Sequence, residues 1–172
     1  MNSFLDTEFQ GFVHRGDTSV FLENTIEAFQ SAVSSGYQYL ETDLRETADG
    51  KIITFHDPNL KRITGANITI SETKFSDIRM RRLPSRETIP TIDELLEEFP
   101  DSFFNMDLKV SHIEEKVLRK INSHNALERV CLGSFNSRTI KKINALEPKI
   151  LTSMGISPVS YTHLRAHETR HD

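Results

Sequence analysis

The sequence has a single cysteine, Cys131, among its 172 residues. One cysteine cannot form an internal disulfide, so the fold must be held together by its apolar core, and a reducing compartment is compatible with it. Cys131 lies in the apolar run RVCLGSF, which predicts a buried structural thiol rather than a nucleophile.

Long apolar runs and an excess of basic charge are also missing. No apolar run approaches the roughly 18 residues that a membrane span requires, and MNSFLDTEFQ at the N-terminus lacks the basic and apolar regions of a secretory signal. The formal net charge of −4 argues against nucleic acid or an anionic membrane as partner. With 37% hydrophobic and 27% charged residues, the sequence predicts one globular core, and we expect a cytoplasmic protein.

Strand-like and helix-like segments alternate along the chain, which favours a parallel α/β sheet. Asn24 followed by Glu27, and Thr91 followed by Glu94, have the spacing of helix N-terminal capping boxes. Residues 57–90 are rich in proline and polar residues and are expected to be mostly loop. The six expected strands are FQGFV before His14, residues 37–44, KIITFH, FFNMDLKV, RVCLGSF and KILTS.

The connection between the second and third expected strands leaves two alternatives open. Residues 44–50 are too few for a crossover helix. The chain must therefore either return in extended form to a parallel strand or make an antiparallel hairpin at the turn signal Asp49-Gly50.

Ionisable residues gather where the expected strands end. His14 and Arg15 follow the first strand, Glu41 and Asp43 lie at the end of the second, and His56 closes the third. Asp107 and Lys109 lie at the end of the fourth. In a parallel α/β barrel, all carboxyl ends of the strands point to one rim, where active sites are assembled.

These residue types indicate a particular chemistry. Glu41, Asp43 and Asp107 form a hard oxygen site without thiols, which suits Mg²⁺ or Ca²⁺ rather than Zn²⁺. Arg15 and Lys109 would add the positive charge that a phosphate needs, and two histidines on the same rim can serve as general acid and base. Taken singly, each pair is more ordinary as a polar strand end, a turn or a surface ion pair; the shared rim is what favours a site.

The order of the motifs resembles the glycerophosphodiester phosphodiesterase family. The motifs are HRG at His14, ENT-x-x-AF at residues 23–29, G-x-x-x-x-E-x-D at residues 36–43, T-x-DG at residues 47–50, HD at His56, IPT at residues 89–91 and N-x-D-x-K at residues 105–109. Two positions depart from the usual pattern: Leu22 stands where proline is common, and Asp107 stands where glutamate is common.

The resemblance implies a TIM (β/α)8-type barrel that hydrolyses small-molecule glycerophosphodiesters to glycerol 3-phosphate and an alcohol, with a divalent cation, Mg²⁺ or Ca²⁺. It implies catalytic roles for His14 and His56, substrate binding by Arg15 and Lys109, and metal binding by Glu41, Asp43 and Asp107. It also favours the parallel return over the hairpin. A related phospholipase D-like lipid phosphodiesterase and a non-catalytic, barrel-derived binding protein remain the alternatives.

The length of the chain sets a further expectation. A barrel of this type takes roughly 250 residues, whereas the sequence offers about six of eight strands before its composition changes in SPVSYTHLRAHETRHD. We expect residues 1–157 to be a partial domain, residues 158–172 to be a non-native tail, and the chain to be an inactive or weakly active fragment. The oligomeric state is not encoded in any pattern that we find.

Overall fold

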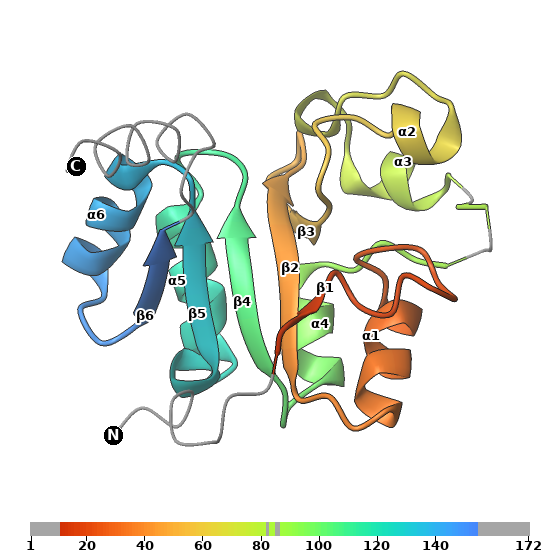
Figure 1. Ribbon diagram of the computed structural model, residues 1–172. Coiled ribbons are helices and arrows are strands. Elements are labelled where there is room, and N and C mark those ends of the chain that lie inside the picture. The colour runs from red at the N-terminus through yellow and green to blue at the C-terminus, as the bar shows by residue number, and fades with distance from the viewer. Residues whose placement is uncertain (1–10, 82, 85–86, 155–172) are drawn as a thin grey trace, which may run out of the picture.

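The computed structural model describes residues 11–81, 83–84 and 87–154. Five strands lie parallel in one sheet, and β3 (Ile52–Thr54) pairs with β2 off this path (Figure 1). The described strands do not close on themselves, because the order runs from β1 at one edge to β6 at the other. This open, six-stranded α/β sheet confirms the predicted incomplete barrel. The parallel strands, in spatial order, are β1 (Val13–His14), β2 (Tyr39–Glu46), β4 (Phe103–Leu108), β5 (Val130–Ser134) and β6 (Leu151–Met154).

The helices that connect the parallel strands pack on one face of the sheet. Side chains alternate along β2 and β4, so Leu40, Phe104 and Met106 face these helices and are fully buried. Burying each such side chain contributes about 1.5–3 kcal/mol. The opposite face carries Glu41 and Asp43 instead, so the same alternation that builds the core directs these carboxylates into the barrel interior. The connecting helices are α1 (Ile26–Ser34), α4 (Ile92–Glu98), α5 (Glu114–Ser123) and α6 (Ser137–Leu146), with a 3-10 turn, η3, at Leu127–Arg129.

The predicted parallel return after β2 is wrong. β3 is antiparallel to β2, with Leu44 opposite Thr54, and the turn between them has Gly50 at a φ of 76°. The intervening residues are too few to travel back along the length of a strand, which a parallel return would need. β2 continues beyond the rim, and the hairpin then brings the chain back to it. The returning chain is held there by the Phe55 N–H, which donates to the Asp43 carbonyl at 2.9 Å.

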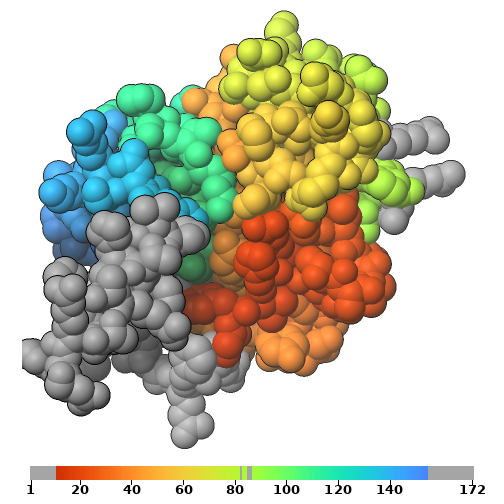
Figure 2. Space-filling model, turned by 45° about the horizontal axis from the view of Figure 1, so that its top comes forward, coloured from red at the N-terminus to blue at the C-terminus, as the bar shows by residue number. Residues whose placement is uncertain are grey.

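The segment between β3 and α4 packs as a small subdomain beyond the carboxyl end of β2 (Figure 1). It consists of loops and short elements, as expected: α2 (Lys61–Thr64), the 3-10 turn η2 (Ile70–Glu72) and α3 (Phe75–Arg79). Its apolar residues form a second core together with β3. Figure 2 shows this subdomain, in yellow, against the loop that follows β1, in red. The buried members of the second core are Ile53, Phe55, Leu60, Ile70, Phe75, Ile78, Leu83 and Ile89.

The caps of two helices test the expected boxes. Thr91 caps α4, and the predicted box with Glu94 is complete. The cap predicted at Asn24 is wrong: Thr25 caps α1 by accepting from the Ala28 N–H, whereas Asn24 adopts a φ of 59° and turns inward.

Cys131 is buried, as predicted, and burial raises its pKa. Of the helices within the described residues, none combines the length and apolar character needed to cross a membrane.

We predict that Gly16→Ala will lower the free energy of unfolding by about 3 kcal/mol. Gly16 has a φ of 82°, and a Cβ there would lie 2.7 Å from the Cβ and carbonyl carbon of Ala28. Gly65 is a matched control, because its φ of 75° is similar but its added Cβ would meet nothing within 4 Å. Urea unfolding should show about 1 kcal/mol for Gly65→Ala. Equal losses for the two variants would contradict the close packing of the HRG loop on α1.

Candidate active site

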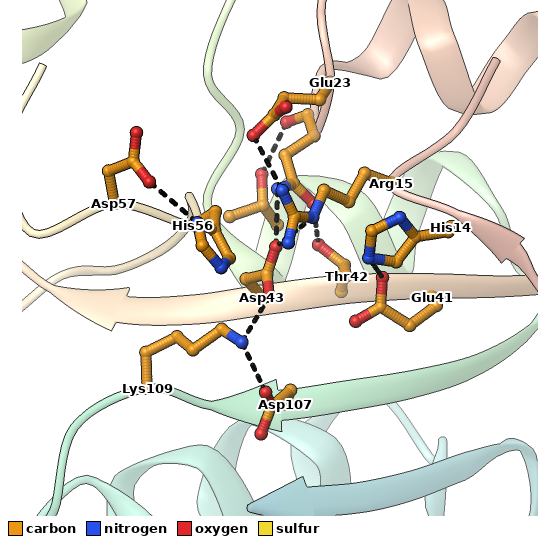
Figure 3. A network of polar contacts seen from close by, with 12 residues as sticks. His14, Arg15, Glu23, Glu41, Thr42, Asp43, His56, Asp57, Asp107 and Lys109 are labelled. Carbon is orange, nitrogen blue, oxygen red and sulfur yellow. Dashed lines mark hydrogen bonds and ion pairs between the residues drawn. The ribbon is translucent and has the colours of Figure 1, made fainter. Parts of the chain in front are cut away.

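The seven residues predicted for the site lie at the same end of the sheet. His14 and Arg15 follow β1, and Glu41 and Asp43 project from β2 toward the barrel interior. Asp107 pairs with Asp43 in the β2–β4 register, and Lys109 follows directly after β4. His56 reaches this rim through the hairpin rather than from the end of a parallel strand. Figure 3 shows these side chains gathered around Asp43.

Asp43 lies at the centre of the network. Its side chain is 1% exposed, and its two oxygens lie 2.9 Å from Arg15 Nε and 2.9 Å from Lys109 Nζ. The Arg15 Nε–Asp43 contact is close but poorly aligned, so it is an ion pair rather than a hydrogen bond. Burying a carboxylate is costly unless cations and donors compensate it, and here the loop after β1 and the end of β4 supply them.

Asn24 supplies the neutral donor to this carboxylate. Its Nδ2 donates to Asp43 Oδ2 at 2.9 Å, while its Oδ1 accepts from Thr42 Oγ1 at 2.8 Å. Its carbonyl accepts from Thr54 Oγ1 at 2.8 Å, so the loop after β1, β2 and β3 are joined through one residue. The sequence pattern predicted only a cap here, because the left-handed backbone that turns the side chain inward leaves no periodic signal.

Lys109 bridges two carboxylates, since its Nζ also lies 2.5 Å from Asp107 Oδ2. Burial lowers the pKa of Lys109, but the hydrogen bonds and charges of Asp107 and Asp43 outweigh it and raise that pKa. The ring of Phe135, at the end of β5, lies with its centroid 5.4 Å from Lys109 Nζ. The lysine is therefore a fixed positive charge on the rim.

Glu41 and His14 form a looser pair, with 3.7 Å between His14 Nε2 and Glu41 Oε2. Burial, and then the charge of Asp43, raise the pKa of Glu41 to about 7. Glu41 Oε2 is buried and accepts no hydrogen bond. Burial and the charge of Arg15 lower the pKa of His14. This part of the site therefore holds a carboxylate whose negative charge is incompletely compensated.

His56 is oriented by its sequence neighbour. Its Nδ1 lies 2.7 Å from Asp57 Oδ1, and its carbonyl accepts from Arg45 Nε at 2.7 Å. His14 and His56 lie on opposite sides of Arg15 and Asp43 (Figure 3). The two rings therefore flank the cationic groups of the site. An anion held between Arg15 and Lys109 would meet a proton-transfer group on either side, which is an arrangement suited to general acid–base catalysis.

Three further residues that sequence reasoning did not place belong to the network. Glu23 accepts from Arg15 Nη1 at 3.2 Å, and Arg62 contacts both Glu23 and Asp57. Asp57 directly follows the predicted histidine, so adjacency was a signal for it. Arg62 lies in a segment that the sequence pattern identified only as loop, so no sequence signal pointed to it.

The metal ligands remain a prediction. Within residues 11–81, 83–84 and 87–154, no group of three or more His, Cys, Asp or Glu side chains is already disposed around a point where an ion could bind. Instead, Lys109 Nζ lies between Asp43 and Asp107. The donor set nevertheless has the chemistry of a hard-cation site, because it consists of carboxylate oxygens from two adjacent strands.

Comparison with known proteins gives a family for this geometry. The model of the glycerophosphoryl diester phosphodiesterase family matches residues 14–170. Probable glycerophosphodiester phosphodiesterase 2 of Mycobacterium tuberculosis is 35% identical over 144 residues, which cover 83% of this chain and 54% of the relative. Lysophospholipase D GDPD1 of Homo sapiens is 34% identical, over 75% of this chain and 46% of its own length. The chain thus spans about half the length of these curated relatives.

Solved structures agree on the fold. A glycerophosphodiester phosphodiesterase from Thermotoga maritima superposes with a TM-score of 0.76 at 25% identity, covering 91% of this chain and 68% of that chain. A putative glycerophosphodiester phosphodiesterase from Galdieria sulphuraria gives a TM-score of 0.78 at 20% identity, covering 92% of this chain and 71% of that chain.

We predict that Glu41→Gln will stabilise the metal-free protein at alkaline pH. Folding raises the Glu41 pKa from 4.5 to about 7, so the folded state binds this proton more tightly than the unfolded state. The stabilisation from that proton is complete below about pH 4.5 and is lost as pH rises through about 7. With EDTA present, the variant's advantage in urea unfolding should grow by about 1–3 kcal/mol between about pH 5 and about pH 8.

The control is Glu97→Gln, an exposed glutamate on α4. This substitution makes the same chemical change on the exposed surface, so it shows how much of the effect belongs to the Glu41 position. A Glu41→Gln advantage that does not change with pH would show that Glu41 ionises normally.

Proposed function

The chain belongs to the glycerophosphoryl diester phosphodiesterase family, and on that premise we propose that it carries the residues for metal-dependent hydrolysis of glycerophosphodiesters to glycerol 3-phosphate and an alcohol. The observation that carries the proposal is the pair of histidines, His14 and His56, flanking two cations and three carboxylates, of which Asp43 is buried and the others are partly buried (Figure 3). Such a cluster has no packing role, because burying charge costs free energy that an apolar core avoids.

In this proposal, Arg15 and Lys109 bind the phosphodiester. Their side chains are 16% and 15% exposed, respectively, and both form ion pairs with Asp43. A fixed positive charge that is already oriented stabilises developing negative charge on phosphoryl oxygens without reorganising during the reaction. Arg15 adds planar donors that match phosphate oxygens, while Lys109 acts as a point charge.

His14 and His56 move the protons. One accepts the proton of the attacking oxygen, from water or from the glycerol hydroxyl of the substrate, and the other donates a proton to the leaving alkoxide. Asp57 holds His56 through Nδ1, which leaves Nε2 for exchange with the substrate. His14 is 67% exposed at its side chain and therefore open to substrate.

Glu41, Asp43 and Asp107 would hold a divalent cation, Mg²⁺ or Ca²⁺. The fit rests on the buried Glu41 Oε2, which lacks a hydrogen bond, and on the all-oxygen donor set. When bound, the ion would polarise phosphoryl oxygens as a Lewis acid. The carboxylates in turn keep Arg15 and Lys109 in place.

The extent of the domain is part of the proposal. We propose that residues 1–157 are part of a longer catalytic domain and that the chain alone is inactive or weakly active, because it spans about half the length of its relatives. Residues 158–172 lie outside the described residues, and the family match includes most of them. Sequencing the gene downstream of codon 157 decides whether this tail is native. We also propose a cytoplasmic location.

A second candidate is a phospholipase D-like activity on lysophospholipids. The observation that favours it is the 34% identity to human Lysophospholipase D GDPD1. Comparing glycerophosphocholine with its singly acylated form separates the two, because an enzyme for glycerophosphodiesters should prefer the deacylated substrate. A non-catalytic binding protein would turn over neither.

We predict that His14→Ala and His56→Ala will each lower kcat for glycerophosphocholine by at least about 10²-fold. Activity is measured on the 172-residue chain and on the chain extended by its natural downstream sequence, whichever hydrolyses the substrate. His124→Ala is the control, because His124 pairs with Asp93 between α4 and α5, away from the rim. Near-normal turnover by either rim variant would refute the acid–base assignment.

We predict that EDTA will abolish the activity and that Mg²⁺ or Ca²⁺ will restore it. Asp107→Asn should lose the ability of either ion to raise the melting temperature, because it removes one anionic ligand. The matched control is Asp93→Asn, which also breaks a lysine ion pair, with Lys120 at 2.8 Å, but on the helical layer. Equal thermal shifts in the two variants would place the ion elsewhere.

A further inference from the structure

Arg62 lies in the subdomain between β3 and α4, and its side chain connects the part of the rim that carries His56 with the part that carries Arg15. Its Nε donates to Asp57 Oδ2 at 2.6 Å. Its Nη2 and Nη1 donate to the two carboxylate oxygens of Glu23 at 2.6 and 3.1 Å. One guanidinium therefore uses three of its donors on two carboxylates that come from different loops.

Asp57 shares its two oxygens between partners. Oδ2 accepts from Arg62 and Oδ1 lies 2.7 Å from His56 Nδ1. Burial raises the pKa of Asp57, but hydrogen bonds from Arg62 and His56 outweigh it and lower that pKa. An ionised carboxylate only accepts hydrogen bonds, so His56 Nδ1 must carry the proton and Nε2 is left free in the neutral ring. The Arg62 contact thus bears on the tautomer of His56.

Glu23 connects Arg62 to Arg15, just as Asp57 connects Arg62 to His56. It accepts from Arg15 Nη1 at 3.2 Å as well as from Arg62. Arg15 has a second anchor in Asp43, at 2.9 Å. His56 has a single side-chain anchor in the described structure, Asp57. The resulting series of polar contacts runs through His56, Asp57, Arg62, Glu23, Arg15, Asp43, Lys109 and Asp107.

We propose that Arg62 is a positioning residue that holds Asp57 so that His56 presents Nε2 to the substrate, and that holds Glu23 so that the Arg15 guanidinium faces the phosphate. This inference rests on the proposed function for the roles of His56 and Arg15. Arg62 itself stays 50% exposed, so its contribution lies in geometry rather than in supporting the core.

The planar shape of arginine matters for this role. Two parallel N–H groups meet the Glu23 carboxylate while Nε, on the adjacent edge, meets Asp57, which a single ammonium group cannot reproduce. Lysine at this position would keep the charge near both carboxylates but lose the fixed fork. Neighbouring Leu60, which is fully buried in the second core, fixes the start of α2 and with it the position of the arginine.

The kinetic test uses the form of the chain that hydrolyses glycerophosphocholine. Arg62→Ala should lower kcat by about tenfold to 100-fold, the cost typical of losing a residue that orients a metal ligand, because Arg62 orients His56 in the same indirect way. KM should change less, because Arg15 keeps its Asp43 anchor. Arg62→Lys should recover part of the loss. Arg79→Ala is the matched control, since Arg79 is an arginine of the same subdomain whose ion pair, with Glu94 at 2.7 Å, lies outside the network.

A spectroscopic test separates this proposal from the proposed function. In the ¹⁵N-histidine-labelled chain, long-range NMR correlations report which ring nitrogen of His56 carries the proton. Wild type and Arg79→Ala should show the Nδ1–H tautomer, and Arg62→Ala should show a mixture with Nε2–H. Wild-type kcat together with an unchanged tautomer in Arg62→Ala would overturn the proposal. If neither the 172-residue chain nor the extended chain hydrolyses glycerophosphocholine, the proposed function fails, but the tautomer still decides whether Arg62 positions His56.

Discussion

The buried carboxylate of Asp43 is the constraint on which the rest of the site depends. With 1% of its side chain exposed, it has lost its water and must be compensated by other groups. The loop after β1 supplies Arg15 and Asn24, and the end of β4 supplies Lys109. Because one anion requires all three, the loops that carry the candidate substrate-binding groups are fixed relative to each other before any substrate binds.

The hairpin of β2 and β3 brings a second histidine, His56, to the rim on the side opposite His14. A parallel strand would have placed His56 at its own carboxyl end. The hairpin instead extends past the rim and returns, so that the Phe55 N–H binds the Asp43 carbonyl and His56 follows at the level of the carboxylates. The same excursion begins the subdomain from which Arg62 reaches back to Asp57 and Glu23.

The sequence predicted those features that have a local or periodic cause. Alternation along β2 placed Glu41 and Asp43 on one face, and the Thr91–Glu94 box placed the start of α4. What it could not predict depends on local backbone conformation that leaves no periodic pattern, or on contacts between distant segments. The direction of β3 is set by a short turn, and the role of Asn24 by a left-handed backbone that no pattern announces. Arg62 acts across 39 positions of sequence from Glu23, so only the fold reveals it.

The most direct test of this account is a crystal structure of the protein with Mn²⁺, which shares the oxygen-ligand preference of Mg²⁺, and with inorganic phosphate. We expect an anomalous peak at ligand distance from the carboxylates of Glu41, Asp43 and Asp107, with the phosphate contacting Arg15 and Lys109 between the two histidines. An ion bound elsewhere, or a phosphate held without Arg15 and Lys109 while Lys109 keeps bridging Asp43 and Asp107, would contradict it.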